Sequence, residues 1–123
     1  MYDPWQHAAS LGLVVRHVPH LPNQGTYRTG QIDLRDGLRR RVERCVLAHE
    51  IAHAVNGDEP TNDPYLYARR ELRADRDAAR RLIPDSFLRH VVIGSDDPGQ
   101  WALELDVTSW ILEARLKDFS WPM

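Results

Sequence analysis

The stretch that most constrains the fold runs from about Leu38 to Val55 and is predicted to form one helix. Its second half is apolar on almost every side, through Cys45, Val46, Leu47, Ala48, Ile51, Ala52, Ala54 and Val55. A helix that is hydrophobic all round is buried in a protein core. Because the same half also carries His49, Glu50 and His53, and buried polar groups need partners, these three side chains are the first candidates for a functional site.

His49 and His53 are spaced so that both can bind one metal ion. Residues four apart lie on the same helix face, one turn apart, so the two imidazoles can point at a single position. Glu50 lies beside that position without having to bind the metal, which is where a general base for a metal-bound water is needed. The pattern His-Glu-x-x-His is typical of zinc peptidases. The alternative is an exposed histidine pair on an ordinary helix, which the apolar surroundings disfavour.

A second helix is predicted from Tyr65 to Ile83, between a cap-and-proline start and a closing proline. Glu71 and Asp75 share one stripe of this helix with apolar residues, so both carboxylates are expected to face inward. Two inward carboxylates repel each other unless cations or hydrogen-bond donors compensate them. We therefore predict that Glu71 is the third zinc ligand and that Asp75 orients one of the two histidines. A surface ion pair with arginine is the alternative for Glu71.

The sequence before the histidine helix favours a small sheet. Leu13–Val18 is rich in β-branched residues and predicts a strand, while Thr26–Arg28 and Gln31–Leu34 flank a Thr-Gly turn and predict a hairpin. Because a lone hairpin is not stable in water, we expect a three-stranded antiparallel sheet packed on the histidine helix. Further helices are predicted at about 3–10, 85–92, 98–105 and 109–118. The expected class is α+β with a mostly helical C-terminal half, in a single domain spanning residues 1–123.

Composition and charge limit the possible functions. The chain has no apolar run long enough to cross a bilayer, and its N-terminus lacks the order of a secretion signal. The single cysteine excludes an internal disulfide and fits a reducing compartment, so a cytoplasmic protein without membrane contacts is expected. The net charge of −2 offers no broad attraction to nucleic acid. Arginines gather on both long helices, but interleaved acidic residues are expected to cancel much of their field.

Three motifs together resemble a known family. HEIAH at His49–His53, ELRAD at Glu71–Asp75 and the stretch Ala78–Pro84 are similar to the motifs of ImmA/IrrE metallo-endopeptidases, a gluzincin-like group, over about residues 10 to 116. In that family a small sheet precedes the HExxH helix, and the glutamate of an ExxxD motif completes the zinc site. The resemblance implies zinc ligands at His49, His53 and Glu71, a catalytic base at Glu50 and a supporting carboxylate at Asp75. Members commonly carry an aromatic residue where this chain has Asp77.

The expected function is zinc-dependent hydrolysis of a peptide bond in a protein substrate. Members of the family cleave or regulate helix-turn-helix repressors in phages, mobile elements and bacteria, so the resemblance implies a transcriptional repressor as partner. Glu50 is expected to take a proton from the zinc-bound water and to return it to the leaving amine. A substrate would lie extended along Gln31–Leu34 or Thr26–Arg28. The candidate oxyanion donors are Tyr65, Tyr67 and His90, with core packing as the other role of each.

Two other functions remain compatible with the sequence. The first is a non-catalytic regulator in which zinc is structural and the domain acts by binding a partner protein, and a fourth protein ligand would mark it. The second is a DNA-binding protein that uses the last two helices, which meet at a turn like that of a helix-turn-helix. No basic cluster accompanies those helices, and base readout needs one, so no direct contact with nucleic acid is expected.

Overall fold

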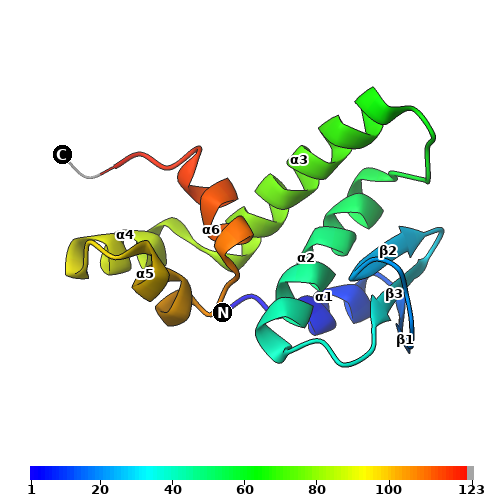
Figure 1. Ribbon diagram of the computed structural model, residues 1–123, viewed down its shortest axis with the longest axis horizontal. Helices are drawn as coiled ribbons and strands as arrows, with labels where there is room; N and C mark the ends of the chain where they lie inside the picture. The colour runs from blue at the N-terminus through cyan, green and yellow to red at the C-terminus, as the bar shows by residue number, and fades with distance from the viewer. Residues whose placement is uncertain (122–123) are drawn as a thin grey trace.

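The computed structural model describes residues 1–121 and consists of a small sheet followed by a helical half (Figure 1). In chain order the elements are α1 (Pro4–Ser10), β1 (Val14–Val18), β2 (Gly25–Arg28), β3 (Gln31–Arg35), α2 (Arg40–Asn56), α3 (Pro64–Leu82), α4 (Asp85–Gly94), α5 (Pro98–Leu105) and α6 (Ser109–Leu116). The expected α+β class is confirmed. The sheet and the pair α4–α5 lie at opposite ends of the molecule, with α2 and α3 between them (Figure 1).

Helix α2 is the buried centre of the fold, as its apolar sequence predicts. Leu47 and Ile51 pack on the sheet in a cluster with Ile32 and Leu34, and all four are fully buried. On another face of α2, Cys45 joins a second cluster, built mainly by the helices that follow. Because α2 contributes to both cores, the polar side chains on it are held among closely packed apolar neighbours.

The sheet is mixed, so the predicted three-stranded antiparallel arrangement is wrong. Strands β2 and β3 do form the predicted antiparallel hairpin, with Gly30 in the turn at φ +77°. Strand β1, however, pairs with β3 in parallel, and the strand order is β1-β3-β2. The central strand β3 is the one whose Ile32 and Leu34 are fully buried. The most deeply buried strand thus lies between two neighbours, an order that the pattern of each strand alone does not encode.

Strand β2 is an edge of the sheet and lies directly against α2. Because β3 is central, Gln31–Leu34 has no free edge for an extended substrate, which excludes one of the two expected substrate strands. Gly25 permits the close approach of β2, since a Cβ there would lie 2.6 Å from Val46 Cγ1 and 3.3 Å from Glu50 Cγ. The sheet edge and the Glu50 face of α2 therefore adjoin.

Helices α2 and α3 run in opposite directions and are joined by a short loop (Figure 1). Helix α2 is closed by a glycine: Gly57 has φ +68°, and the N–H of Asp58 donates to the carbonyl of His53 at 2.9 Å. Helix α3 begins at the predicted cap, where the Asp63 side chain accepts two backbone N–H groups of the first turn. The buried face of α3 is rich in alanine, so α3 can lie close to its neighbours.

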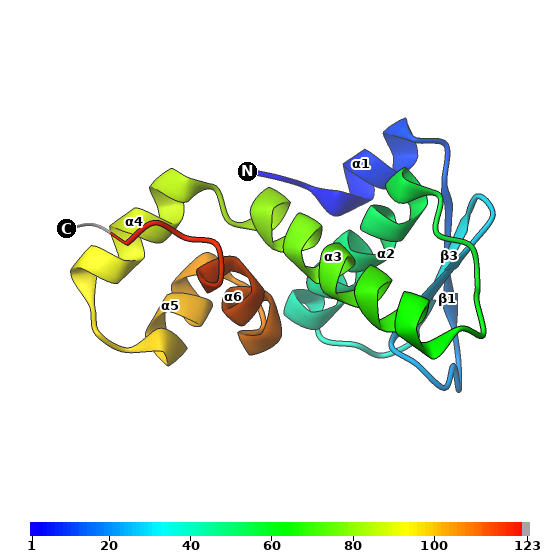
Figure 2. The same cartoon turned by 90° about the horizontal axis from the view of Figure 1, so that it is seen from above.

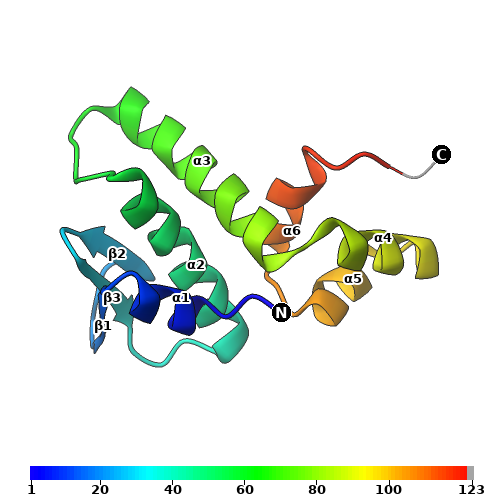
Figure 3. The ribbon, with the colours of Figure 1, turned by 180° about the vertical axis from the view of Figure 1, so that it is seen from behind.

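Helices α4 to α6 complete the second core (Figures 2 and 3). Trp101 of α5 and Ile111 of α6 are buried in it. The turn between α5 and α6 is fixed to α2, because Arg44 Nη1 donates to the carbonyl of Asp106 at 2.8 Å. Their apolar faces therefore serve the core. Within residues 1–121, none of the helices combines the length and the apolar character that crossing a membrane requires.

Replacing Gly25 with alanine is predicted to push β2 away from α2. The added methyl group overlaps the Val46 side chain, and overpacking of this kind costs about 1–3 kcal/mol of unfolding free energy. Urea unfolding followed by circular dichroism measures the change. Gly94→Ala is the matched control, because a Cβ at that position meets nothing within 4 Å and φ is not positive. An equal loss of stability in the two variants would contradict the close approach at Gly25.

Candidate metal centre

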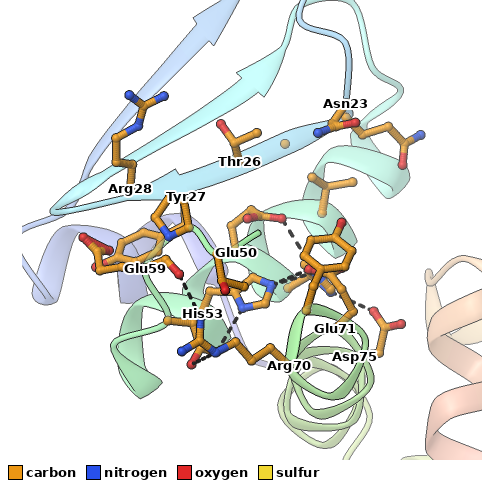
Figure 4. Close-up of a pocket in the computed structure, with 18 of the residues that line it drawn as sticks. Asn23, Thr26, Tyr27, Arg28, Glu50, His53, Glu59, Arg70, Glu71 and Asp75 are labelled. Atoms are coloured by element: carbon orange, nitrogen blue, oxygen red, sulfur yellow. Dashed lines mark hydrogen bonds and ion pairs between the residues drawn. The ribbon is translucent and has the colours of Figure 1, made fainter. Parts of the chain in front are cut away.

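Two histidines of α2 and a glutamate of α3 converge on one point, and Figure 4 shows His53 and Glu71 side by side. The Nε2 atoms of His49 and His53 lie 3.2 Å apart. Glu71 reaches both rings, with Oε2 2.9 Å from His49 Nε2 and Oε1 2.9 Å from His53 Nε2. Ligand atoms around a tetrahedral zinc with bonds of about 2.0–2.1 Å are about 3.3 Å from one another. These three side chains, all predicted as ligands, therefore have the donor atoms and the spacing that fit a shared zinc ion.

A carboxylate holds the far nitrogen of each imidazole. His49 Nδ1 lies 2.7 Å from Asp75 Oδ1, and His53 Nδ1 lies 3.0 Å from Asp58 Oδ2. When each Nδ1 carries the proton and donates it to its carboxylate, each Nε2 presents a lone pair toward the centre. Asp75 was predicted for this role with either histidine, and the structure places it against His49.

Asp58 is not among the site residues that the sequence motifs predict. The signal for it lay in the sequence: Gly57 closes α2 with a turn that bonds the N–H of Asp58 to the carbonyl of His53. The residue after such a glycine therefore lies next to the second histidine. Arg73 Nη2 donates to both Asp58 oxygens, at 2.6 and 2.7 Å. Burial raises the pKa of Asp58, but the hydrogen bonds from Arg73 and His53 outweigh it, so the net shift is downward and the carboxylate stays ionised.

Glu50 is buried beside the histidine pair, but it lies farther from the rings than Glu71 does. Its Oε2 lies 3.7 Å from His49 Nε2, and its side chain lies on the β2 side of the imidazoles (Figure 4). Burial raises the pKa of Glu50; the charges of His49 and His53 oppose this rise, and the net shift is upward. A carboxylate with a raised pKa holds an accepted proton more readily than an ordinary one, as a general base must before it passes the proton on.

The centre is built to hold positive charge. Burial disfavours the charged form of His49, but its hydrogen bonds with Asp75 and Glu71 outweigh that effect and raise its pKa to about 10. Burial likewise opposes ionisation of Glu71, yet the hydrogen bonds from His49 and His53 lower the pKa of Glu71 to about 2. Four carboxylates thus surround two imidazoles, and they favour a cation at the point where the two Nε2 atoms and Glu71 meet.

A cleft of about 520 Å³ opens over this centre, with β2 on one side and the start of α3 on the other. Tyr67 lies one turn before Glu71 and lines the cleft. The charge of Glu71, burial and the charge of Glu50 raise the pKa of Tyr67. Tyr65 and His90 do not line the cleft. Tyr65, Tyr67 and His90 are all exposed, so core packing is excluded as their role.

Two further contacts of the α2–α3 region were not predicted. Glu59, in the loop after α2, accepts hydrogen bonds from the N–H and the hydroxyl of Thr29 in the β2–β3 turn. This bond ties the loop to the hairpin at one end of the cleft, where Figure 4 shows Glu59 near Tyr27. Asp77, which stands where the family commonly has an aromatic residue, accepts from Asn56 Nδ2 at 3.3 Å. A polar contact therefore joins α3 to the end of α2 at this position.

An HExxH helix packed on a small sheet, with a glutamate supplied by the next helix, defines the class of zinc-metallopeptidase-like domains. The sequence model of a peptidase family described as the IrrE N-terminal-like domain matches residues 8–117, and the chain belongs to that family. The resemblance to ImmA/IrrE proteins is thereby confirmed. The comparison with curated proteins finds no match.

Replacing Glu71 with alanine is predicted to abolish stable zinc binding. The variant keeps both histidines but loses the oxygen donor that reaches each of them, and a catalytic zinc site needs about three protein ligands. Elemental analysis after dialysis is expected to find about one zinc per wild-type chain and almost none in the variant. Glu113→Ala, an exposed glutamate on α6, is the matched control. Full zinc retention by Glu71→Ala would show that this carboxylate is not a ligand.

Proposed function

We propose that this protein is a zinc-dependent endopeptidase that hydrolyses a peptide bond in a protein substrate. The observation that supports the proposal most is the convergence of His49, His53 and Glu71 at the base of an open cleft, with Glu50 buried beside them. The family resemblance supports a helix-turn-helix transcriptional repressor of a phage or mobile element as the substrate. A zinc ion held by the two histidines and Glu71 would lower the pKa of a water molecule and polarise the scissile carbonyl.

Glu50 supplies the proton transfers of the proposed reaction. Its carboxylate accepts a proton from the attacking water and later delivers that proton to the nitrogen of the leaving amine. Its burial and raised pKa suit this role, because the protonated form must persist between the two transfers. The hydrogen bonds of His49 to Asp75 and of His53 to Asp58 keep both imidazoles fixed during the reaction.

Strand β2 offers the means of positioning an extended peptide. It pairs only with β3 within the described sheet, so its outer edge carries backbone groups that a substrate strand can bond. Gly25 through Arg28 line the cleft together with Glu50 and the histidines. A peptide added to this edge would pass over the metal centre. Because main-chain hydrogen bonds would hold it, peptides of many different sequences could bind there.

Tyr67 is the group we assign to the oxyanion. It lies on the same face of α3 as Glu71, one turn earlier, and it lines the cleft, unlike Tyr65 and His90. Its hydroxyl can donate a hydrogen bond to the carbonyl oxygen as negative charge develops there. With a side chain about half exposed (54%), Tyr67 can reach a bound substrate without rearrangement of the core.

The alternative function is a zinc-containing regulator that acts by binding a partner protein. In that case zinc is structural, and structural sites are closed by a fourth protein ligand. Within the part of the chain that the structure describes, Glu50 is the candidate, since it forms a possible metal-binding group with His49 and His53. Its carboxylate lies 3.7 Å from His49 Nε2, whereas that of Glu71 lies at 2.9 Å. This longer distance favours Glu50 as a base over Glu50 as a ligand.

Glu50→Gln separates the two functions. If Glu50 is the general base, the variant keeps zinc but its kcat falls by about 10²–10⁴-fold, since the amide cannot accept the proton. Cleavage of a mixed-sequence peptide library, read by mass spectrometry, measures activity, and elemental analysis measures zinc. Loss of zinc from Glu50→Gln would instead identify Glu50 as a fourth ligand. A wild-type protein that retains zinc but cleaves no peptide would refute the endopeptidase.

Tyr67→Phe is predicted to lower kcat by about 10²-fold with little change in KM or zinc content, because the lost hydrogen bond forms mainly in the transition state. The cleaved peptides identified above provide the assay. Tyr65→Phe is the matched control, since Tyr65 lies on the same helix but outside the cleft. If Tyr67→Phe instead raised KM and left kcat unchanged, Tyr67 would serve substrate binding alone.

A further inference from the structure

The fold separates the charges that alternate along α3. In the sequence, Glu71, Asp75 and Asp77 stand among six arginines of this helix. In the structure, Glu71 and Asp75 turn to the histidines of α2, and Asp77 receives a hydrogen bond from Asn56. These acidic side chains are thus engaged on the α2 side of the helix. Part of the arginine charge of this helix is therefore left without a close carboxylate, although the whole chain carries a net charge of −2.

A shallow groove of about 440 Å³ lies along this outer side, with a mixed basic and apolar lining. In Figure 2, α3 lies in front of α2, and no other element of residues 1–121 covers the side of α3 that faces the viewer. The basic lining consists of Arg69, Arg70, Arg73 and Arg76. Leu66 and Leu72 provide the apolar part, and Leu72 is 64% exposed. The groove thus combines positive charge with an apolar contact surface.

Two of the four arginines are committed to the protein and two are available. Arg73 binds Asp58 at 2.6 Å, and Arg70 Nη1 donates to the carbonyl of Glu59 at 2.8 Å. Arg69 lies over the ring of Tyr65, and within residues 1–121 no carboxylate lies at ion-pair distance from it. For Arg76, the one carboxylate at ion-pair distance in this described part of the chain is that of its neighbour Asp77, at 4.0 Å. Arg69 and Arg76 can therefore form new ion pairs without loss of an existing strong one.

The chemistry of this surface fits an acidic polypeptide that also carries aliphatic side chains. Carboxylates match Arg69 and Arg76, and aliphatic groups match Leu66 and Leu72. The groove also adjoins the cleft, because Asp58 and Arg70 line both. We infer that the outer side of α3 is a docking site for an acidic, leucine-containing segment of the protein substrate, separate from the peptide that enters the cleft. The identity of this partner as the substrate rests on the proposed function.

The experiment measures docking directly and needs no cleavage. A fluorescein-labelled peptide of alternating glutamate and leucine is titrated with the zinc-loaded Glu50→Gln protein at low salt, and anisotropy reports binding. Adding Arg69→Ala and Arg76→Ala is expected to weaken binding by about tenfold, and added salt is expected to weaken it further. The control pair is Arg16→Ala with Arg80→Ala, which removes the same charge at exposed arginines outside the groove. Circular dichroism confirms that both proteins are folded.

Two kinds of outcome overturn the inference. Absence of peptide binding, or equal weakening in the two double variants, would show that the groove has no specific role. The alternative ligand is a single-stranded oligothymidine. If it bound more tightly than the acidic peptide, and if the Arg69→Ala, Arg76→Ala variant lost that binding, the surface would be a nucleic-acid site. Hydrolysis of short library peptides does not use the groove, so failed docking with intact hydrolysis refutes only this proposal. Docking without hydrolysis refutes only the endopeptidase.

Discussion

The two hydrogen-bond distances between Glu71 and the paired imidazoles are the constraint on which the rest of the structure depends. Histidines four apart on one helix supply two donors, and a third must come from another helix held at the right distance. The alanine-rich face of α3 permits that distance. Asp58 and Asp75 then fix the rings, so that the carboxylate of Glu71 meets both Nε2 atoms at 2.9 Å. Sheet, loop and C-terminal helices all hold α2 and α3 in this relation.

Local sequence patterns predicted what is set locally. The bounds of α2 and α3 follow from Gly57, Asp63 and the prolines, because capping and backbone conformation act within one turn. Helical spacing likewise placed His49 and His53 on one face. The order of the strands was not predictable in this way, since it depends on which strand is buried between two others. Contacts between loops, such as Glu59 with Thr29, leave no periodic signal in the sequence either.

The charges of α3 show a second limit of sequence analysis. Interleaved acids and arginines suggested a face whose field largely cancels. A helix, however, directs neighbouring residues to different sides, so cancellation along the sequence is not cancellation in space. Here Glu71 and Asp75 face the histidines of α2, whereas Arg69 and Arg76 line the groove on the outer side. A helix that supplies a metal ligand therefore acquires an outer surface of opposite sign to the site that it builds.

Asp58 contacts both the metal centre and a residue of the outer groove. One of its carboxylate oxygens accepts a hydrogen bond from His53, and both oxygens accept hydrogen bonds from Arg73. Arg73 lies on α3 and lines the groove. A ligand that drew Arg73 outward would leave Asp58 to His53 alone and would change how firmly that ring is held. By thermodynamic reciprocity, occupancy at either end then alters affinity at the other by the same factor. Under that condition the shared carboxylate would couple binding at the outer groove to the hold on His53.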